Sequence, residues 1–125
     1  MAYPGSAISI AIVDDDESAR NAMHGVLQSV GYKAESFASA EQLLERDGAA
    51  NFACLITDLK MPGMNGLALQ AALARAGSRI PIIFVSAQRD EAARMRALGA
   101  GAVGFLHKPF DDEALIAMVR AALAR

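Results

Sequence analysis

The sequence predicts a doubly wound α/β fold: a parallel sheet of five strands with five helices. Two observations carry this prediction. Short apolar runs alternate with segments of helical periodicity, and the runs are nearly continuous instead of alternating apolar with polar residues. Continuous apolar runs are typical of strands covered on both faces, as in parallel sheets. Strands that alternate with helices imply right-handed crossovers, which place helices on both faces of the sheet.

Five short segments are the expected strands. Four of them are strongly apolar, and the segment YKAESF is weaker. In chain order, the expected strands cover residues 8–13, 32–37, 52–56, 82–85 and 103–106. Their short length separates them from the longer periodic segments that follow each one.

One helix is expected after each strand. The first shows apolar residues on one helical face and then a glycine that can end the helix, in the order Ala19, Ala22, Met23, Val26, Leu27, Val30 and Gly31. The other four begin after residues that can cap a helix N-terminus, namely Ser39, Asn65, Asp90 and Asp111. Gly77 and Gly99 are the expected ends of the third and fourth helices.

Composition and charge narrow the class of protein. The 125 residues are expected to form one domain with a folded core over about 7–124. The net charge of −2 gives no reason to expect nucleic-acid binding, and the single cysteine cannot form an internal disulfide. The sequence shows no signal peptide and no long apolar segment, so we expect a cytoplasmic domain without a membrane association.

Reactive side chains follow four of the five expected strands. Asp14, Asp15 and Asp16 follow the first strand, and the other strand ends carry Asp58, Ser86 and Lys108. In an open parallel sheet, ligands bind at the carboxyl ends of the strands, where the strand order reverses. We therefore expect these side chains to meet at one rim of the sheet.

Such a rim suits phosphoryl transfer. Two carboxylates about 4 Å apart repel by roughly 4 kcal/mol at an effective dielectric constant of about 20, so a cation must offset them. A hard divalent ion such as Mg²⁺ fits a set of oxygen ligands and leaves positions for phosphate oxygens. Lys108 adds a positive charge, Ser86 a hydroxyl, and a carboxylate can act as the nucleophile.

The motifs resemble those of the receiver domains of two-component response regulators. The segments IVDDDESAR, TDLKMPGMNG and GAGAVGFLHKPF carry the resemblance, which is nearest to the FixJ-type receivers and covers nearly the whole chain. The resemblance implies a flavodoxin- or CheY-like fold with strand order 2-1-3-4-5 and a cis Lys108–Pro109 bond. It also implies a phosphorylation-driven change in the face formed by the fourth helix, the fifth strand and the fifth helix.

The resemblance also implies roles for individual residues. Asp58 is the implied phosphoacceptor, and Asp15 and the backbone carbonyl of Lys60 are implied ligands of Mg²⁺, with Asp14 acting through water. Mn²⁺ is expected to substitute for Mg²⁺. Lys108 and Ser86 would bind the phosphoryl group, and Phe105 would change rotamer when Ser86 moves. Residues that modulate the lifetime of the phosphoryl group would be Lys60, Ala87 and Gln88.

Several alternatives remain open at this point. The metal pair could be Asp15 and Asp16 instead of Asp14 and Asp15, Asp16 could be a helix cap, and Phe105 could be a plain core residue. A hydrolase of the haloacid-dehalogenase type also uses an aspartate at a strand end, but it needs a second aspartate where this chain has Lys60. A pseudo-receiver, which keeps the fold without phosphorylation, is the alternative function.

The resemblance further implies partners. A histidine kinase or a phosphotransfer protein would supply the phosphoryl group, and a homodimer could form on phosphorylation. The protein would not be a conventional enzyme, although it would catalyse its own phosphorylation and dephosphorylation. FixJ-type receivers usually precede a DNA-binding domain, so we expect either a single-domain regulator or the receiver of a larger transcription regulator.

Overall fold

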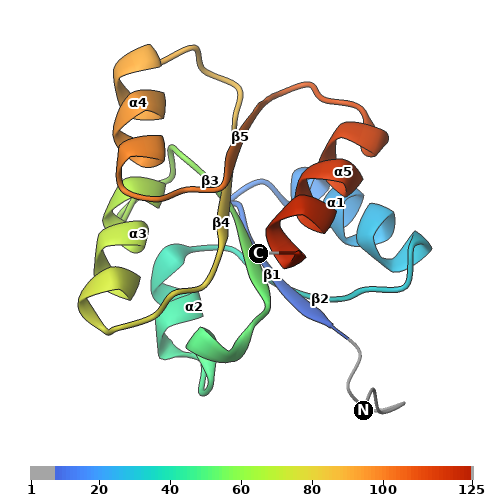
Figure 1. Cartoon of the computed structure of the whole chain (residues 1–125), viewed down its shortest axis with the longest axis horizontal. Helices are drawn as coiled ribbons and strands as arrows, with labels where there is room; N and C mark the ends of the chain where they lie inside the picture. The colour runs from blue at the N-terminus through green and yellow to red at the C-terminus, as the bar shows by residue number, and fades with distance from the viewer. Residues whose placement is uncertain (1–7, 125) are drawn as a thin grey trace.

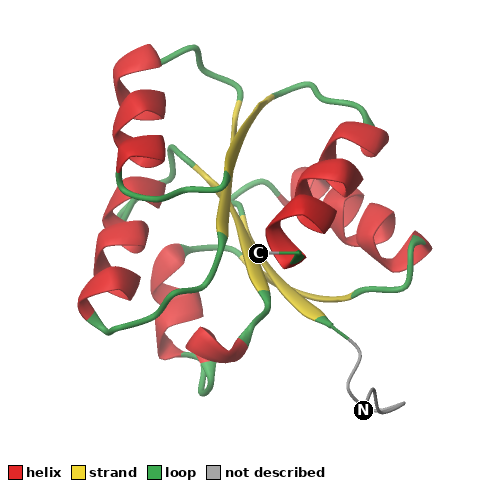
Figure 2. Ribbon diagram, in the orientation of Figure 1, coloured by secondary structure: helices red, strands yellow, loops and turns green. Residues whose placement is uncertain are grey.

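The computed structural model describes residues 8–124 and contains a five-stranded parallel sheet between two layers of helices (Figure 2). The strand order is β2-β1-β3-β4-β5. The strands are β1 (Ser9–Val13), β2 (Lys33–Phe37), β3 (Cys54–Asp58), β4 (Ile82–Ser86) and β5 (Gly104–His107). The helices are α1 (Glu17–Ser29), α2 (Ala40–Glu45), α3 (Gly66–Arg75), α4 (Glu91–Gly99) and α5 (Asp112–Leu123). The predicted fold class and strand order are confirmed.

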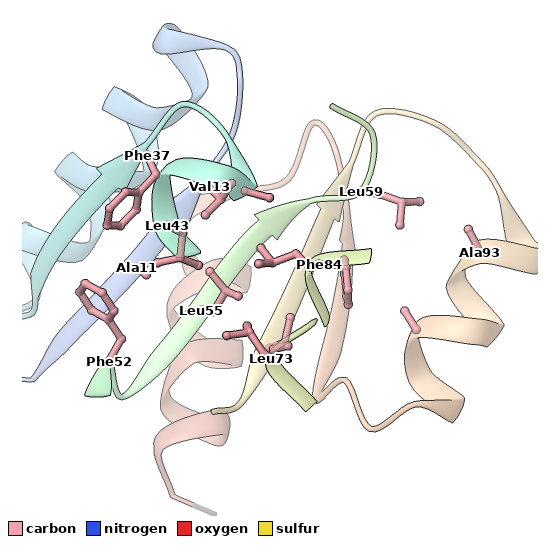
Figure 3. Close-up of a cluster of buried hydrophobic side chains, with 14 residues drawn as sticks. Ala11, Val13, Phe37, Leu43, Phe52, Leu55, Leu59, Leu73, Phe84 and Ala93 are labelled. Atoms are coloured by element: carbon pink, nitrogen blue, oxygen red, sulfur yellow. The ribbon is translucent and has the colours of Figure 1, made fainter. Parts of the chain in front are cut away.

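Each face of the sheet has its own apolar core. Helices α1 and α5 cover one face, and α2, α3 and α4 cover the other (Figure 1). Alternate residues of a strand point to opposite faces, so Ile10 and Ile12 of β1 pack towards α1 and α5, while Ala11 and Val13 pack towards α2 and α3. Figure 3 shows the core between the sheet and helices α2, α3 and α4, in which Phe37 and Phe52 pack edge-on with ring centroids 6.0 Å apart.

The helix N-termini follow the predicted capping pattern. The side chains of Ser39, Asn65, Asp90 and Asp111 each accept a hydrogen bond from a backbone N–H in the first turn of the helix that follows. Asp16 does the same for α1, where it accepts from the Ser18 N–H at 3.0 Å. Asp16 therefore has a structural role that is separate from the rim.

Two local features differ from the sequence-based expectation. The third strand is expected at 52–56, but β3 covers Cys54–Asp58, because Thr57 and Asp58 continue the pairing with β4. The 3₁₀ turn Ala49–Asn51 was not predicted. The fourth helix ends at Gly99, as predicted, and the left-handed conformation is taken by Gly101, with φ 105°.

Cys54 lies in β3 and is fully buried. Burial raises the pKa of its thiol to about 12, so the thiolate is scarce at neutral pH. Among the described residues, no helix is long and apolar enough to cross a bilayer.

Candidate functional site

The predicted rim residues meet at the carboxyl ends of four strands. Asp14 follows β1, Asp58 ends β3, Ser86 ends β4 and Lys108 follows β5. The order of the strands reverses at β1, which lies between β2 and β3, and this is where open α/β sheets bind ligands. Carboxylate oxygens of Asp14, Asp15 and Asp58 all lie within 4.8 Å of one another.

Asp14 is the most constrained member of this acidic cluster. It is 0 % exposed, its Oδ1 accepts a hydrogen bond from the Asp16 N–H at 2.9 Å, and its Oδ2 accepts from Lys108 Nζ at 2.7 Å. Arg20 Nη1 donates to the Asp14 carbonyl at 2.7 Å and so ties α1 to the end of β1. Asp15 is exposed, while Asp16 is the cap of α1. This geometry favours Asp14 and Asp15 over Asp15 and Asp16 as the metal pair.

Asp58 is partly buried, and its environment disfavours its charge. Burial and the neighbouring Asp14 carboxylate raise its pKa against the opposing effect of Lys108. Lys108 Nζ lies 3.3 Å from Asp58 Oδ2. A carboxyl whose pKa is raised on folding destabilises the fold when ionised, and that penalty disappears as the pH falls through the raised pKa. The ionised Asp58 carboxylate therefore lowers the stability of the metal-free protein at neutral pH.

Lys108 links the buried carboxylate of Asp14 to the partly buried carboxylate of Asp58. Burial alone would lower its pKa, but the hydrogen bond to Asp14 and the charges of Asp58 and Asp14 outweigh burial and raise that pKa. The ammonium thus stays charged at neutral pH and stands between two anionic groups. The Lys108–Pro109 bond is cis, as predicted.

Ser86 lies at the rim but its hydroxyl is engaged locally. The side chain is 1 % exposed, and its Oγ accepts from the Gln88 N–H at 3.1 Å and lies 3.3 Å from the Gln88 carbonyl oxygen. To donate to a ligand at Asp58, the hydroxyl must release that carbonyl. Ala87 and Gln88, the next two residues of the chain, are exposed.

Phe105 lies on the α4 side of the sheet, opposite Phe84 in the register of β4 and β5. Its ring is partly buried and stacks on the buried Phe84, with centroids 6.3 Å apart and planes at 23°. Phe84 in turn closes the space around Gly66, where an added Cβ would lie 2.9 Å from the Phe84 ring and 2.4 Å from the Asp58 carbonyl oxygen. Only glycine lets α3 begin this close to the end of β3.

The donor set of the cluster fits Mg²⁺. All three side-chain donors are carboxylate oxygens, and hard divalent ions prefer oxygen. Lys60 lies two residues after Asp58 in the loop, and its backbone N–H lies 3.4 Å from Asp58 Oδ1.

Sequence reasoning missed three contacts around the site. They are the Arg20 bond to Asp14, an ion pair between Lys60 and Asp90 at 3.6 Å, and a bond from the Met64 N–H to Glu41 at 3.0 Å. Of these contacts, only the one made by Arg20 had a signal in the sequence, because Arg20 is the last residue of the motif IVDDDESAR.

The fold and rim define a class of α/β proteins with an acidic, lysine-bridged site at the carboxyl ends of the strands. The family model described as "Response regulator receiver domain" matches residues 10–120. The chain therefore belongs to the response regulator receiver family. Receiver domains of response regulators take a phosphoryl group from histidine kinases and bind Mg²⁺ at an acidic pocket.

Similar proteins agree with this assignment. The response regulator protein TmoT of Ectopseudomonas mendocina is 41 % identical over 114 residues, which are 91 % of this chain and 52 % of TmoT. The transcriptional regulatory protein FixJ of Azorhizobium caulinodans is 34 % identical over 95 % of this chain and 56 % of FixJ. The chain spans about half the length of these curated relatives.

Solved structures show the same fold. The crystal structure of FixJ-N has a TM-score of 0.86 at 32 % identity and covers 96 % of both chains. The Vibrio cholerae chemotaxis protein CheY4 has a TM-score of 0.86 at 28 % identity, over 94 % of this chain and 100 % of that protein. The predicted resemblance to FixJ-type receivers is thus confirmed.

Proposed function

We propose that Asp58 is the phosphoacceptor of a single receiver domain formed by this chain. One observation carries the proposal: the carboxylates of Asp14, Asp15 and Asp58 meet at the strand ends, with the Lys108 ammonium bonded to two of them. A pseudo-receiver would have no use for this complete set. The raised pKa of Asp58 adds support, because perturbed titrations cluster at functional sites.

The proposed step is a nucleophilic displacement. A carboxylate oxygen of Asp58 attacks the phosphorus of a phosphohistidine on a histidine kinase or a phosphotransfer protein. The new O–P bond forms as the P–N bond breaks, and the leaving imidazole keeps the electron pair of that bond and takes one proton from solvent. Lys108, which bridges Asp14 and Asp58, would then pair with the transferred phosphoryl oxygens.

The acidic cluster would hold the cofactor. Asp15 and Asp58 would bind Mg²⁺ directly, Asp14 through water, and the Lys60 carbonyl would complete the protein ligands. Bound Mg²⁺ supplies neutralisation of the charge on the transferring group. We expect Mn²⁺ to substitute, because it also accepts oxygen ligands.

Ser86 and Phe105 would transmit the change. Donation from Ser86 to a phosphoryl oxygen requires its hydroxyl to leave the Gln88 carbonyl, and Phe105 would follow into the space beside Phe84. The surface formed by α4, β5 and α5 would change as a result. Lys60 lies two residues after Asp58, and Ala87 and Gln88 follow Ser86; these three residues would set the lifetime of the phosphoryl group.

We further infer a role in transcription control. Relatives such as TdiR of Thauera aromatica are named transcriptional regulatory proteins, and this chain covers 53 % of TdiR. The chain would act in the cytoplasm, with no direct contact to nucleic acid or membrane, and phosphorylation could drive dimer formation.

Incubation with acetyl phosphate and Mg²⁺ tests the proposal. Intact-protein mass spectrometry should find one added phosphoryl group in the wild type and none in Asp58→Asn. A missing adduct in the wild type, or an adduct that survives in Asp58→Asn, would overturn the assignment.

A matched pair of variants tests the metal site. Asp15→Asn should abolish Mg²⁺ binding measured by titration calorimetry, whereas Asp16→Asn should keep it, because asparagine also caps helices. Loss of Mg²⁺ binding in both variants would instead move the metal pair to Asp15 and Asp16. Asp58→Asn should also be more stable than the wild type at pH 7 without Mg²⁺, and this difference should shrink as the pH falls through the raised pKa of Asp58.

A further inference from the structure

We propose that Glu41 of α2 is a positioning residue for the metal-binding loop, residues 59–65, which joins β3 to α3. The inference rests on the proposed function, in which this loop supplies the Lys60 carbonyl to Mg²⁺. Glu41 Oε2 accepts a hydrogen bond from the Met64 N–H at 3.0 Å, across 23 residues of sequence. The contact joins a helix outside the site to the loop that follows the phosphoacceptor.

The two ends of this loop are fixed by the backbone. The Leu59 N–H donates to the Val85 carbonyl at 3.2 Å, the Gly66 N–H donates to the Leu59 carbonyl at 2.9 Å, and Asn65 caps α3. Within the described part of the chain, no backbone–backbone hydrogen bond holds residues 60–64. The N–H groups of these five residues contact two carboxylates: the Lys60 N–H lies 3.4 Å from Asp58, and the Met64 N–H donates to Glu41. The Glu41 carboxylate provides the shorter of the two contacts.

Glu41 is well placed to hold the loop because α2 itself is anchored. Ala40 and Leu43 are buried in the core, and a reciprocal cap fixes the start of the helix: the Gln42 N–H donates to Ser39 Oγ at 3.1 Å, and the Ala38 N–H donates to Gln42 Oε1 at 3.0 Å. The carboxylate therefore projects from a fixed turn.

The loop is shaped to receive this carboxylate. Gly63 has a positive φ of 74°, and a Cβ added there would lie 2.8 Å from Glu41 Oε2. A side chain at residue 63 would push the carboxylate away. The Met64 N–H also lowers the pKa of Glu41, so the carboxylate is charged at neutral pH and remains an acceptor.

Loss of this contact should loosen the loop without disturbing the acidic cluster. Lys60 lies four residues before Met64, and the freed stretch would place its carbonyl at the metal less often. Mg²⁺ affinity should then fall by about two- to tenfold, the effect of one net hydrogen bond. At saturating Mg²⁺ the rate of phosphorylation should return to that of the wild type, because the nucleophile is unchanged.

The test compares three variants. Glu41→Ala should raise the Kd for Mg²⁺ in calorimetry and should speed hydrogen exchange of the Met64 amide in metal-free protein. Glu41→Gln keeps an acceptor oxygen and should restore most of both properties. Glu45→Ala, at an exposed position of the same helix but without this contact, should match the wild type.

The outcomes separate the inference from the proposed function. Wild-type protein that binds Mg²⁺ without accepting a phosphoryl group would defeat the proposed function, while the Mg²⁺ and exchange data would still decide the role of Glu41. A Glu41→Ala variant with the Mg²⁺ affinity and Met64 exchange of Glu45→Ala would overturn the inference.

Discussion

Helices α4 and α5 flank β5 on opposite faces of the sheet, and they are held there by different means (Figure 1). Helix α5 buries Leu115, Val119 and Ala122. Helix α4 buries only two alanines, Ala93 and Ala97, while its Met95 side chain is 59 % exposed. Because a buried leucine stabilises a fold by about 2 kcal/mol more than a buried alanine, α5 is much more firmly attached.

Polar contacts replace apolar burial in α4. Gln70 Nε2 of α3 donates to the Ala97 carbonyl at 3.1 Å, and Asp90 both caps α4 and pairs with Lys60. A hydrogen bond of this kind contributes about 1 kcal/mol, and an exposed ion pair contributes no more than about 0.5 kcal/mol. The α4 side of β5 is therefore held less firmly than the α5 side.

The largest test compares the apolar anchors of the two helices. Leu115→Ala should lower the free energy of unfolding by about 2–5 kcal/mol through the cavity it leaves. Ala97→Gly should cost only about 1 kcal/mol, mostly through helix propensity. Urea denaturation of both variants measures the two values. Similar losses of unfolding free energy in the two variants would contradict the conclusion that α5 is more firmly attached than α4.

The N-cap residues of α4 and α5 allow a more closely matched comparison of the two helices. Asp90→Ala and Asp111→Ala should each cost about 1 kcal/mol of stability, because each removes one hydrogen bond to the first turn. Asp90→Ala should cost slightly more, since it also removes the ion pair with Lys60. Asparagine at each position keeps the cap and serves as the control. A larger loss at Asp111 would contradict the dependence of α4 on polar contacts.

Much of this site was predictable because the signals are local. The strand-end carboxylates, the helix caps and Lys108 follow from short segments whose chemistry does not depend on distant residues. The Glu41–Met64 bond, the Lys60–Asp90 pair and the Gln70–Ala97 bond could not be predicted, because each joins elements whose separation only the packed fold determines. Single charged residues on exposed helix faces carry no sign of such partners.

The buried Gln70 is the third test. Gln70→Met keeps most of the volume but removes the donor to Ala97, whose carbonyl still accepts from the Ala102 N–H at 3.0 Å. We expect a loss of about 1 kcal/mol and faster hydrogen exchange in α4 than in α5. Gln28→Met, at an exposed position of α1, is the matched control and should change little. Equal acceleration in α4 and α5 would show that the bond has no local effect.

The smallest expected effect belongs to the Lys60–Asp90 ion pair. Both side chains are substantially exposed, so Lys60→Met should change stability by no more than about 0.5 kcal/mol. A double-mutant cycle with Asp90→Asn at low and high salt isolates the interaction. A coupling energy that does not fall at high salt would rule out a screened surface pair.

The sequence carries a single thiol, Cys54, whose burial and raised pKa make it inert towards alkylating reagents while the protein is folded. The native protein can thus be labelled at one chosen site without first removing its own cysteine. Met95→Cys on α4 and Ala117→Cys on α5, both at exposed positions, would each accept one spin label or dye. Spectroscopy could then follow the two sides of β5 separately in solution, with all other residues unchanged.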